Sequence, residues 1–165
     1  MYIRLLGYLC MVLLVVMLLF SGVIDFFAVF NDGKMSITDI PKSQSVNWIY
    51  LNTPPKSVFL TQDYFMQPPS LAGRSIFMGW PYFPWSLGYD TNKRGSIVKQ
   101  IFQATSKKNA CELLKSNNIS FIFYNVNSIP DPNTQEPSSV YTHDFTPLYQ
   151  DDDGYIIQSV SQNCP

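Results

Sequence analysis

A run of 20 residues without a charged side chain, 5–24, is the feature that most limits how this chain of 165 residues can fold. A helix rises 1.5 Å per residue, so the run reaches about 30 Å, the thickness of the hydrocarbon core of a bilayer. Backbone polar groups in that core have no water to bind and must bond to one another, which favours a helix. A transmembrane helix is therefore expected near the N-terminus.

A cleaved signal peptide is the alternative, because residues 1–4 are short and basic. Against it, the uncharged run exceeds the roughly 7–15 residues of a signal peptide, and no A-x-A-like site follows Phe20. Arg4 flanks one end of the run, whereas Asp25 and Asp32 follow the other end. The positive-inside rule then predicts an integral, single-pass protein with a cytoplasmic N-terminus and an extracytoplasmic or luminal C-terminal domain.

The composition excludes several classes of function. Charged residues make up 14% of the chain, the net charge is −1, and no cluster of Lys and Arg offers a surface for nucleic acid. The single histidine, His143, argues against a histidine-based metal site or a catalytic triad. The acidic run 151–154 lacks the later ligands of an EF-hand and is typical of a hairpin turn. We expect no metal, no cofactor and no nucleic-acid partner.

The rest of the chain predicts one small domain. We divide the sequence into a membrane helix with its exit (1–30), a linker (31–42), an extracytoplasmic domain (43–160) and a C-terminal tail (161–165). Helical and strand-like patterns alternate, which indicates an α/β fold with a mostly parallel sheet and a C-terminal β-hairpin. The expected elements are helices with N-caps at Ser43, Thr91 and Ser106, strands over 57–61, 74–78 and 119–124, a loop over 125–139, and a hairpin of 147–150 and 155–160.

Aromatic residues interleaved with Gly and Pro fill the segment 71–94, LAGRSIFMGWPYFPWSLGYDTNKR. We expect a rigid irregular loop, whose exposed rings would suit sugar faces or a membrane interface. Its two arginines can pair with phosphate or carboxylate, and its aspartate can hold one of them. The alternative is that the rings form the core and that Arg74 and Asp90 form a structural ion pair. The candidate binding residues are Arg74, Trp80, Tyr82, Trp85, Tyr89, Asp90 and Arg94.

Two further features leave alternatives open. Cys111 lies on the inward face of its expected helix and Cys164 lies near the chain end. In an oxidising compartment they can pair, but a buried free thiol at Cys111 fits equally well. Asn118 begins a glycosylation sequon, which enters a strand expected to be buried, so we do not expect full glycosylation.

Taken in order, the segments resemble a known family. A helix ending SGVID precedes WIYLNTPPKSVFLT, the aromatic segment 71–94, ACELLKSNNISFIFY and LYQDDDGYIIQSV. This resembles the C-terminal end of polytopic membrane proteins of the GT-C glycosyltransferase type, in which a final transmembrane helix leads into a small extracytoplasmic α/β domain. The resemblance covers nearly the whole chain, and the segment 71–94 is its most specific part.

The resemblance implies enzymes that move a sugar from a lipid-phosphate donor, with an acidic residue in an early luminal loop as base or metal partner. The sequence holds no earlier span, so we expect the catalytic part to be missing and assign no catalytic residue, neither Asp25 nor Asp32. The resemblance would place the segment 71–94 at a membrane-side cavity, near donor phosphate or acceptor.

Two functions then compete. The chain is either part of such an enzyme, not catalytic alone, or a free-standing single-pass binding or assembly subunit. A secreted domain is a third possibility. The expected partners are the lipid bilayer and a lipid-linked sugar or a polytopic membrane protein.

Overall fold

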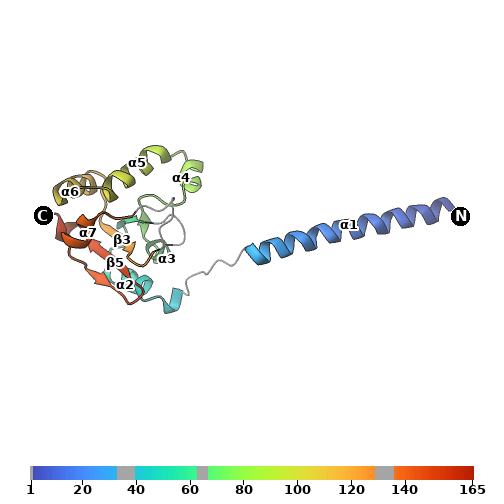
Figure 1. The fold of residues 1–165 in the computed structure, drawn as a ribbon, viewed down its shortest axis with the longest axis horizontal. Helices are drawn as coiled ribbons and strands as arrows, with labels where there is room; N and C mark the ends of the chain where they lie inside the picture. The colour runs from blue at the N-terminus through green and yellow to red at the C-terminus, as the bar shows by residue number, and fades with distance from the viewer. Residues whose placement is uncertain (1, 33–39, 63–66, 129–135) are drawn as a thin grey trace. The chain divides into compact units, whose positions relative to one another are not determined.

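The structure is a computed structural model that describes residues 2–32, 40–62, 67–128 and 136–165. The chain separates into two compact units, residues 1–37 and 38–165 (Figure 1).

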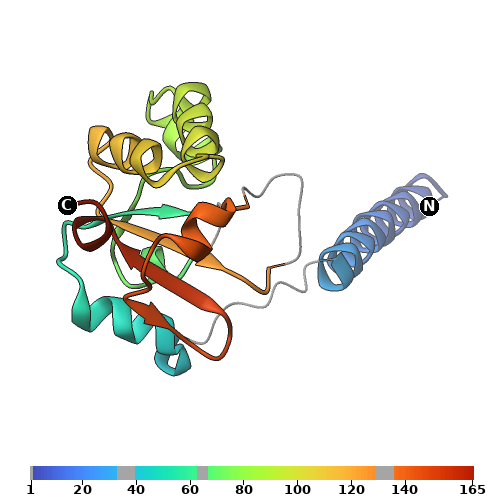
Figure 2. The ribbon, with the colours of Figure 1, turned by 60° about the vertical axis from the view of Figure 1, so that its left-hand side comes forward.

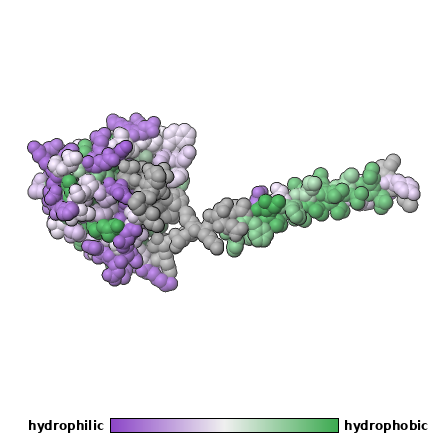
Figure 3. Space-filling model, viewed as in Figure 1, coloured by the Kyte–Doolittle hydropathy of each residue, from purple (hydrophilic) through white to green (hydrophobic). Residues whose placement is uncertain are grey.

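The first unit holds one long helix, α1 (Tyr2–Asp32). Its segment Arg4–Phe27 has a mean hydropathy of 2.6, and none of it is buried. Figure 3 shows this segment as an almost continuous apolar surface. By length and composition the helix can cross a membrane, although a signal sequence near an N-terminus passes the same test. The expected apolar helix is confirmed, and it extends beyond the uncharged run at both ends.

The second unit contains a five-stranded sheet with the order β2-β1-β3-β5-β4. β1 pairs in parallel with β2 and β3, whereas β5 pairs antiparallel with β3 and β4. The α/β fold is confirmed, and the C-terminal hairpin, β4 and β5, makes the sheet a mixed one. The strands are β1 (Val58–Thr61), β2 (Ser75–Ile76), β3 (Phe121–Asn125), β4 (Tyr149–Gln150) and β5 (Tyr155–Ser159).

Helices cover both faces of this sheet, as the two ribbon views show (Figures 1 and 2). α5 (Thr91–Phe102), α6 (Lys107–Ser116) and α7 (Ser139–His143) pack on one face, and α2 (Gln44–Asn52) and α3 (Pro68–Leu71) pack on the other. Along β3, Ile122 and Tyr124 face the first layer and Phe123 faces the second. Burial on both faces explains why this strand is almost wholly apolar. The remaining elements are η1 (Ile40–Lys42), α4 (Tyr82–Ser86) and α8 (Val160–Asn163).

Side-chain caps begin four of these helices, and three of the caps, those of α2, α5 and α6, test the predicted N-caps. Ser43 Oγ accepts a hydrogen bond from Val46 N, and Ser106 Oγ accepts one from Asn109 N, each at 3.3 Å, so both predicted N-caps are confirmed. At α5 the prediction was wrong by one residue. The cap is Asp90, whose Oδ1 accepts from Lys93 N at 3.0 Å, and Thr91 is the first helical residue. A carboxylate also suits the positive end of a helix dipole.

Two predicted strands are shorter than expected because helix-ending turns occupy their first residues. Gly73 follows α3 at φ +72°, and Arg74 N donates to Pro69 O across that turn. Ile119 N donates to Leu114 O at the end of α6. Only after these turns can the backbone pair in the sheet. Of the predicted loop 125–139, residues 129–135 lie outside the described residues, and Ser139 begins α7.

Candidate functional site

The aromatic segment contains a short helix, α4, where the sequence predicts an irregular loop between the strand over 74–78 and the helix with its cap at Thr91. Pro81 is its N-cap, and Pro84 lies in its first turn, where a missing N–H costs no helical hydrogen bond. The helix ends at Ser86, and Gly88, just after the C-cap Leu87, has φ +82°. Gly88 N donates to Trp85 O and Tyr89 N donates to Pro84 O, both at 3.0 Å. This pair of bonds is the Schellman motif, and it fixes how the segment leaves the helix.

The side chains around α4 point into solvent. Six of the ten large apolar side chains that are exposed in the described part of residues 38–165 lie within 80–89. Tyr82, Phe83, Trp85 and Leu87 are each more than 60% exposed. The alternative in which these rings form the core is therefore wrong. Clustered apolar exposure of this kind marks an interaction surface. The six residues are Trp80, Tyr82, Phe83, Trp85, Leu87 and Tyr89, and we call them the aromatic surface.

A groove of about 680 Å³ runs beside α4, toward β2 and the start of α5. Most of the aromatic surface contributes to it, but Tyr82 and Trp85 do not; they flank a smaller hollow with Pro81 and Thr91. Of the predicted binding residues, the structure thus brings Trp80, Tyr89 and Arg94 together in the groove. The main lining side chains are Ile76, Phe77, Trp80, Phe83, Leu87, Tyr89 and Arg94.

Arg94 is the cation of this groove. Its guanidinium carbon lies 4.7 Å from the ring centroid of Tyr89 and 5.4 Å from that of Phe77, within cation–π range. Nη1 donates to Phe77 O at 3.0 Å, its one hydrogen bond among the described residues. The guanidinium is thus oriented by two rings while most of its N–H donors stay available to an anion.

Arg74 has a different environment. It is 9% exposed, and it does not line the groove. Nε donates to Thr53 Oγ1, Nη2 donates to Tyr50 O and Thr53 O, and Nη1 donates to Ala72 O, all at 2.9–3.0 Å. Arg74 therefore joins the end of α2 to the end of α3 through backbone carbonyls, where we had considered an ion pair with Asp90. Its contact with a substrate stays a prediction.

Phe83 and Leu87 line the groove, and sequence reasoning did not select them. They stand four residues apart and so share one face of α4 and its end. The signal was present in the spacing, but it has meaning only if residues 82–86 are helical. Prolines ordinarily break a helix, so the sequence predicts no helix here and gives the i, i+4 spacing no meaning.

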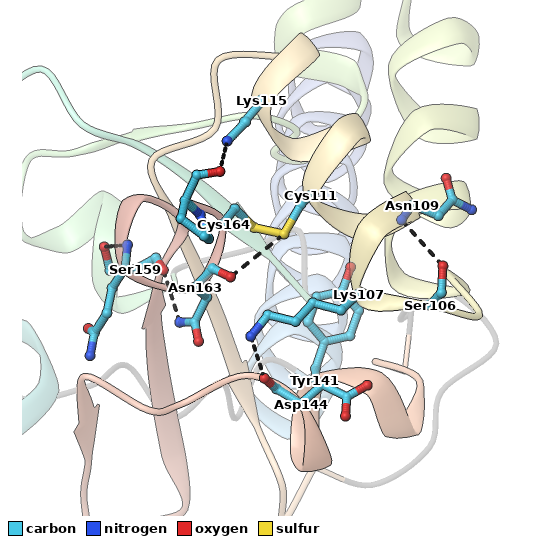
Figure 4. Close-up of a disulfide and its surroundings, with 12 residues drawn as sticks. Ser106, Lys107, Asn109, Cys111, Lys115, Tyr141, Asp144, Ser159, Asn163 and Cys164 are labelled. Atoms are coloured by element: carbon cyan, nitrogen blue, oxygen red, sulfur yellow. Dashed lines mark hydrogen bonds between the residues drawn. A yellow bond between two sulfur atoms is a disulfide. The ribbon is translucent and has the colours of Figure 1, made fainter.

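A disulfide joins Cys111 on α6 to Cys164 after α8, with Cα atoms 5.5 Å apart (Figure 4). This answers the question that the sequence left open. Lys115 Nζ donates to Pro165 O at 2.7 Å beside it, so the chain end is fixed twice. Cys10 in α1 is a free, exposed thiol. Among the described residues, no group of three His, Cys, Asp or Glu side chains can hold a metal ion.

Comparison with known proteins supports the fold. No protein-family model and no curated protein matches the sequence. Among solved structures, the chain is similar to the C-terminal globular domain of an oligosaccharyltransferase from Archaeoglobus fulgidus, with a TM-score of 0.50 and 12% sequence identity. The match covers 76% of this chain and 99% of that domain. At this identity the likeness establishes the fold, which is the architecture that the resemblance to GT-C proteins implied.

Proposed function

We propose that the chain is a membrane-anchored, extracytoplasmic module of a GT-C-type glycosyltransferase system that uses lipid-phosphate sugars. One observation carries the proposal: an apolar helix long enough to span a bilayer precedes a domain with the fold of an oligosaccharyltransferase C-terminal domain. No catalytic role is assigned to the module, and its contribution is to bind. Fold alone does not define function, so the proposal also depends on the chemistry of the groove.

The groove suits a sugar linked to a phosphate. The rings of Trp80 and Tyr89 offer flat apolar faces of the kind on which the C–H groups of a sugar stack. Arg94, held between two rings, presents donors that fit phosphate oxygens. Together they match the two parts of a lipid-linked sugar that lie outside the hydrocarbon.

The disulfide supports an extracytoplasmic position for the domain. Disulfides persist in oxidising compartments and are rare in the cytosol. A covalent link between Cys111 and Cys164 agrees with the charge distribution around α1, which favours a cytoplasmic N-terminus.

Binding to lipid-linked sugar is tested with the full chain in phosphatidylcholine nanodiscs, titrated with a polyprenyl phosphate hexose and followed by tryptophan fluorescence. Replacing Arg94 with Gln removes the charge and is expected to weaken binding roughly tenfold, the loss typical of a charge-assisted hydrogen bond. Lys99→Gln, the same change of charge at an exposed position on α5, is the matched control and should bind normally. Failure of the folded wild-type chain to bind rejects the proposed ligand.

The alternative is a free-standing binding or assembly subunit that contacts a polytopic protein. Two further exposed apolar side chains, Tyr50 and Leu51 on α2, favour it, since they are available for contact with another protein. An antibody against the domain distinguishes the two functions in native membranes. A band near 18.9 kDa that co-purifies with a polytopic protein favours the subunit, and a band several times larger favours part of one enzyme.

A further inference from the structure

We propose that the outer side chains of α4 and of its C-cap, namely Tyr82, Phe83, Trp85 and Leu87, insert into the interface of the lipid bilayer that holds α1. The composition of this surface fits that environment. Tyr and Trp have amphipathic rings that settle at the headgroup level, and Phe and Leu add purely apolar area. Each of the four is 63–76% exposed, so no described part of the chain covers them.

The surface is already rigid. Pro81 and Pro84 restrict the backbone of α4, and the Schellman motif at Gly88 fixes the helix end. Insertion therefore orders little backbone, and the cost of binding that flexible loops incur is small here. A rigid apolar surface gains more from burial than a disordered loop with the same residues.

The chain itself indicates which occupant covers this surface. The apolar span ends at Phe27, α1 ends at Asp32, and the next described element begins at Ile40. When α1 spans a bilayer, the residues between the span and the domain can extend over at most about 35 Å, so this length limits how far the start of the domain can lie from the lipid. Docking is then an intramolecular event at high effective concentration, for which a modest affinity suffices.

Apolar insertion, rather than attraction to anionic lipid, is the expected source of binding. Within residues 80–94 the charged side chains are Asp90, Lys93 and Arg94, and Asp90 caps α5 beside Lys93. The net charge of this segment is +1, much smaller than that of the polybasic surfaces that bind anionic headgroups. Docking should therefore occur on neutral lipid and change little with salt.

Docking also has a consequence that rests on the proposed function. Phe83 and Leu87 belong both to the inserting surface and to the wall of the groove. Their insertion would bring Trp80 and Arg94 to headgroup depth, where the phosphate of a membrane-embedded sugar lipid lies. Docking itself does not depend on any sugar.

The test uses the full chain in vesicles of phosphatidylcholine alone, so that failure of sugar binding cannot affect it. The three tryptophans are Trp48, Trp80 and Trp85, and none lies in α1. A protein with Trp48→Phe and Trp80→Phe reports on Trp85 only, and a protein with Trp80→Phe and Trp85→Phe reports on Trp48, which is half-buried against Tyr149. Lipids brominated near the headgroup end of the acyl chain quench rings at that depth.

We expect bromolipid to remove most of the Trp85 emission and to leave Trp48 emission unchanged, at low and high salt alike. Phe83→Ser with Leu87→Ser should abolish the quenching of Trp85, whereas Tyr50→Ser with Leu51→Ser, equally exposed on α2, should preserve it. Equal quenching of Trp85 and Trp48, or none of Trp85 in a folded protein, overturns the proposal. The proposal is also overturned if Trp85 is quenched only when the vesicles contain anionic lipid. It is overturned as well if a polytopic protein protects Trp85 in native membranes.

Discussion

Nε of Arg74 donates a 3.0 Å hydrogen bond to Oγ1 of Thr53, and the same Oγ1 donates at 2.7 Å to Ile49 O in the last turn of α2. Arg74 thereby continues the hydrogen bonding of a helix whose C-cap, Thr53, lies 21 residues earlier in the chain. A planar guanidinium is needed, since several acceptors lie around it at fixed angles.

Arg74→Lys should therefore destabilise the domain. A lysine ammonium cannot reproduce the fork, so buried carbonyls lose partners, and we expect a loss of about 2 kcal/mol in the free energy of unfolding. Urea unfolding of the full chain in detergent, followed by Trp48 fluorescence in the Trp80→Phe, Trp85→Phe background, measures it. Arg94 lies in the open groove, so Arg94→Lys should lower the free energy of unfolding by less than about 0.5 kcal/mol. Unchanged stability of Arg74→Lys together with lost sugar-lipid binding would instead make Arg74 a ligand residue.

Asn118 predicts opposite effects for two substitutions. It is the one residue other than glycine with positive φ, +55°, among the described residues, and it closes the Schellman motif at the end of α6. We expect Asn118→Gly to stabilise the domain by about 0.5 kcal/mol and Asn118→Ala to destabilise it by about 1 kcal/mol, because alanine resists this backbone conformation. Thermal unfolding of protein expressed without N-glycosylation compares them. Both variants delete the amide, so a shift of the same sign in both would point to a side-chain role.

The parts of the fold that could be predicted from the sequence depend on local chemistry. Ser43 and Ser106 were recognised as caps because their hydroxyls bond to a backbone N–H three residues on. The strand β3 was recognised because a run of large apolar residues is too short for a buried helix and rich in aromatic and β-branched side chains.

The parts that were missed depend on tertiary context. The partners of Arg74 lie mainly on residues 50–53, and no local pattern brings them together. The helix α4 was hidden because prolines at its start resemble breakers. The sequence left exposed rings and core rings as two open alternatives for the aromatic segment. It could not decide between them, since the same ring types fill the core at Phe59 and Phe102, where helices and strands meet.

Tyr149 makes the stability of the domain depend on pH in the alkaline range. The hydroxyl of Tyr149 donates a hydrogen bond to Asp151 Oδ2 at 3.2 Å. Burial first, and then the negative charge of Asp151, raise the pKa of Tyr149 from 10.0 to about 12. Between about pH 10 and 12 the unfolded chain loses this proton while the folded protein keeps it, so stability falls as pH rises through that window. Below pH 10 both states are protonated and no slope arises from this group.

Tyr149→Phe should reduce this pH dependence. Tyr124, whose pKa burial also raises to about 12, stays in place, so a smaller slope must remain. The urea midpoint at pH 8.5 and 10.5 compares wild type with the variant, and Tyr50→Phe, an exposed tyrosine on α2, is the control that should keep the full slope. If the urea midpoint of Tyr149→Phe falls between these two pH values as far as that of the wild type, the ionisation of Tyr149 is not linked to folding.

The disulfide predicts both a thiol count and a stability change. The chain has three cysteines, and Cys111 and Cys164 are joined, so the denatured, unreduced protein should expose one reactive thiol, Cys10. Cys10→Ser should bring that count to zero, and prior reduction of the wild type should raise it to three. The link closes a separation of 53 residues, for which loop-closure entropy predicts a stabilisation of about 4 kcal/mol.

Cys111→Ser with Cys164→Ser in the Cys10→Ser background should therefore lower the free energy of unfolding by about 2–4 kcal/mol. Adding reductant should lower the stability of Cys10→Ser to that of the triple variant and leave the triple variant itself unchanged. A count of three thiols in protein taken from native membranes without reductant would show that the cysteines are not joined there. It would remove the support that the disulfide lends to an extracytoplasmic domain, while the charge distribution around α1 would still favour that orientation.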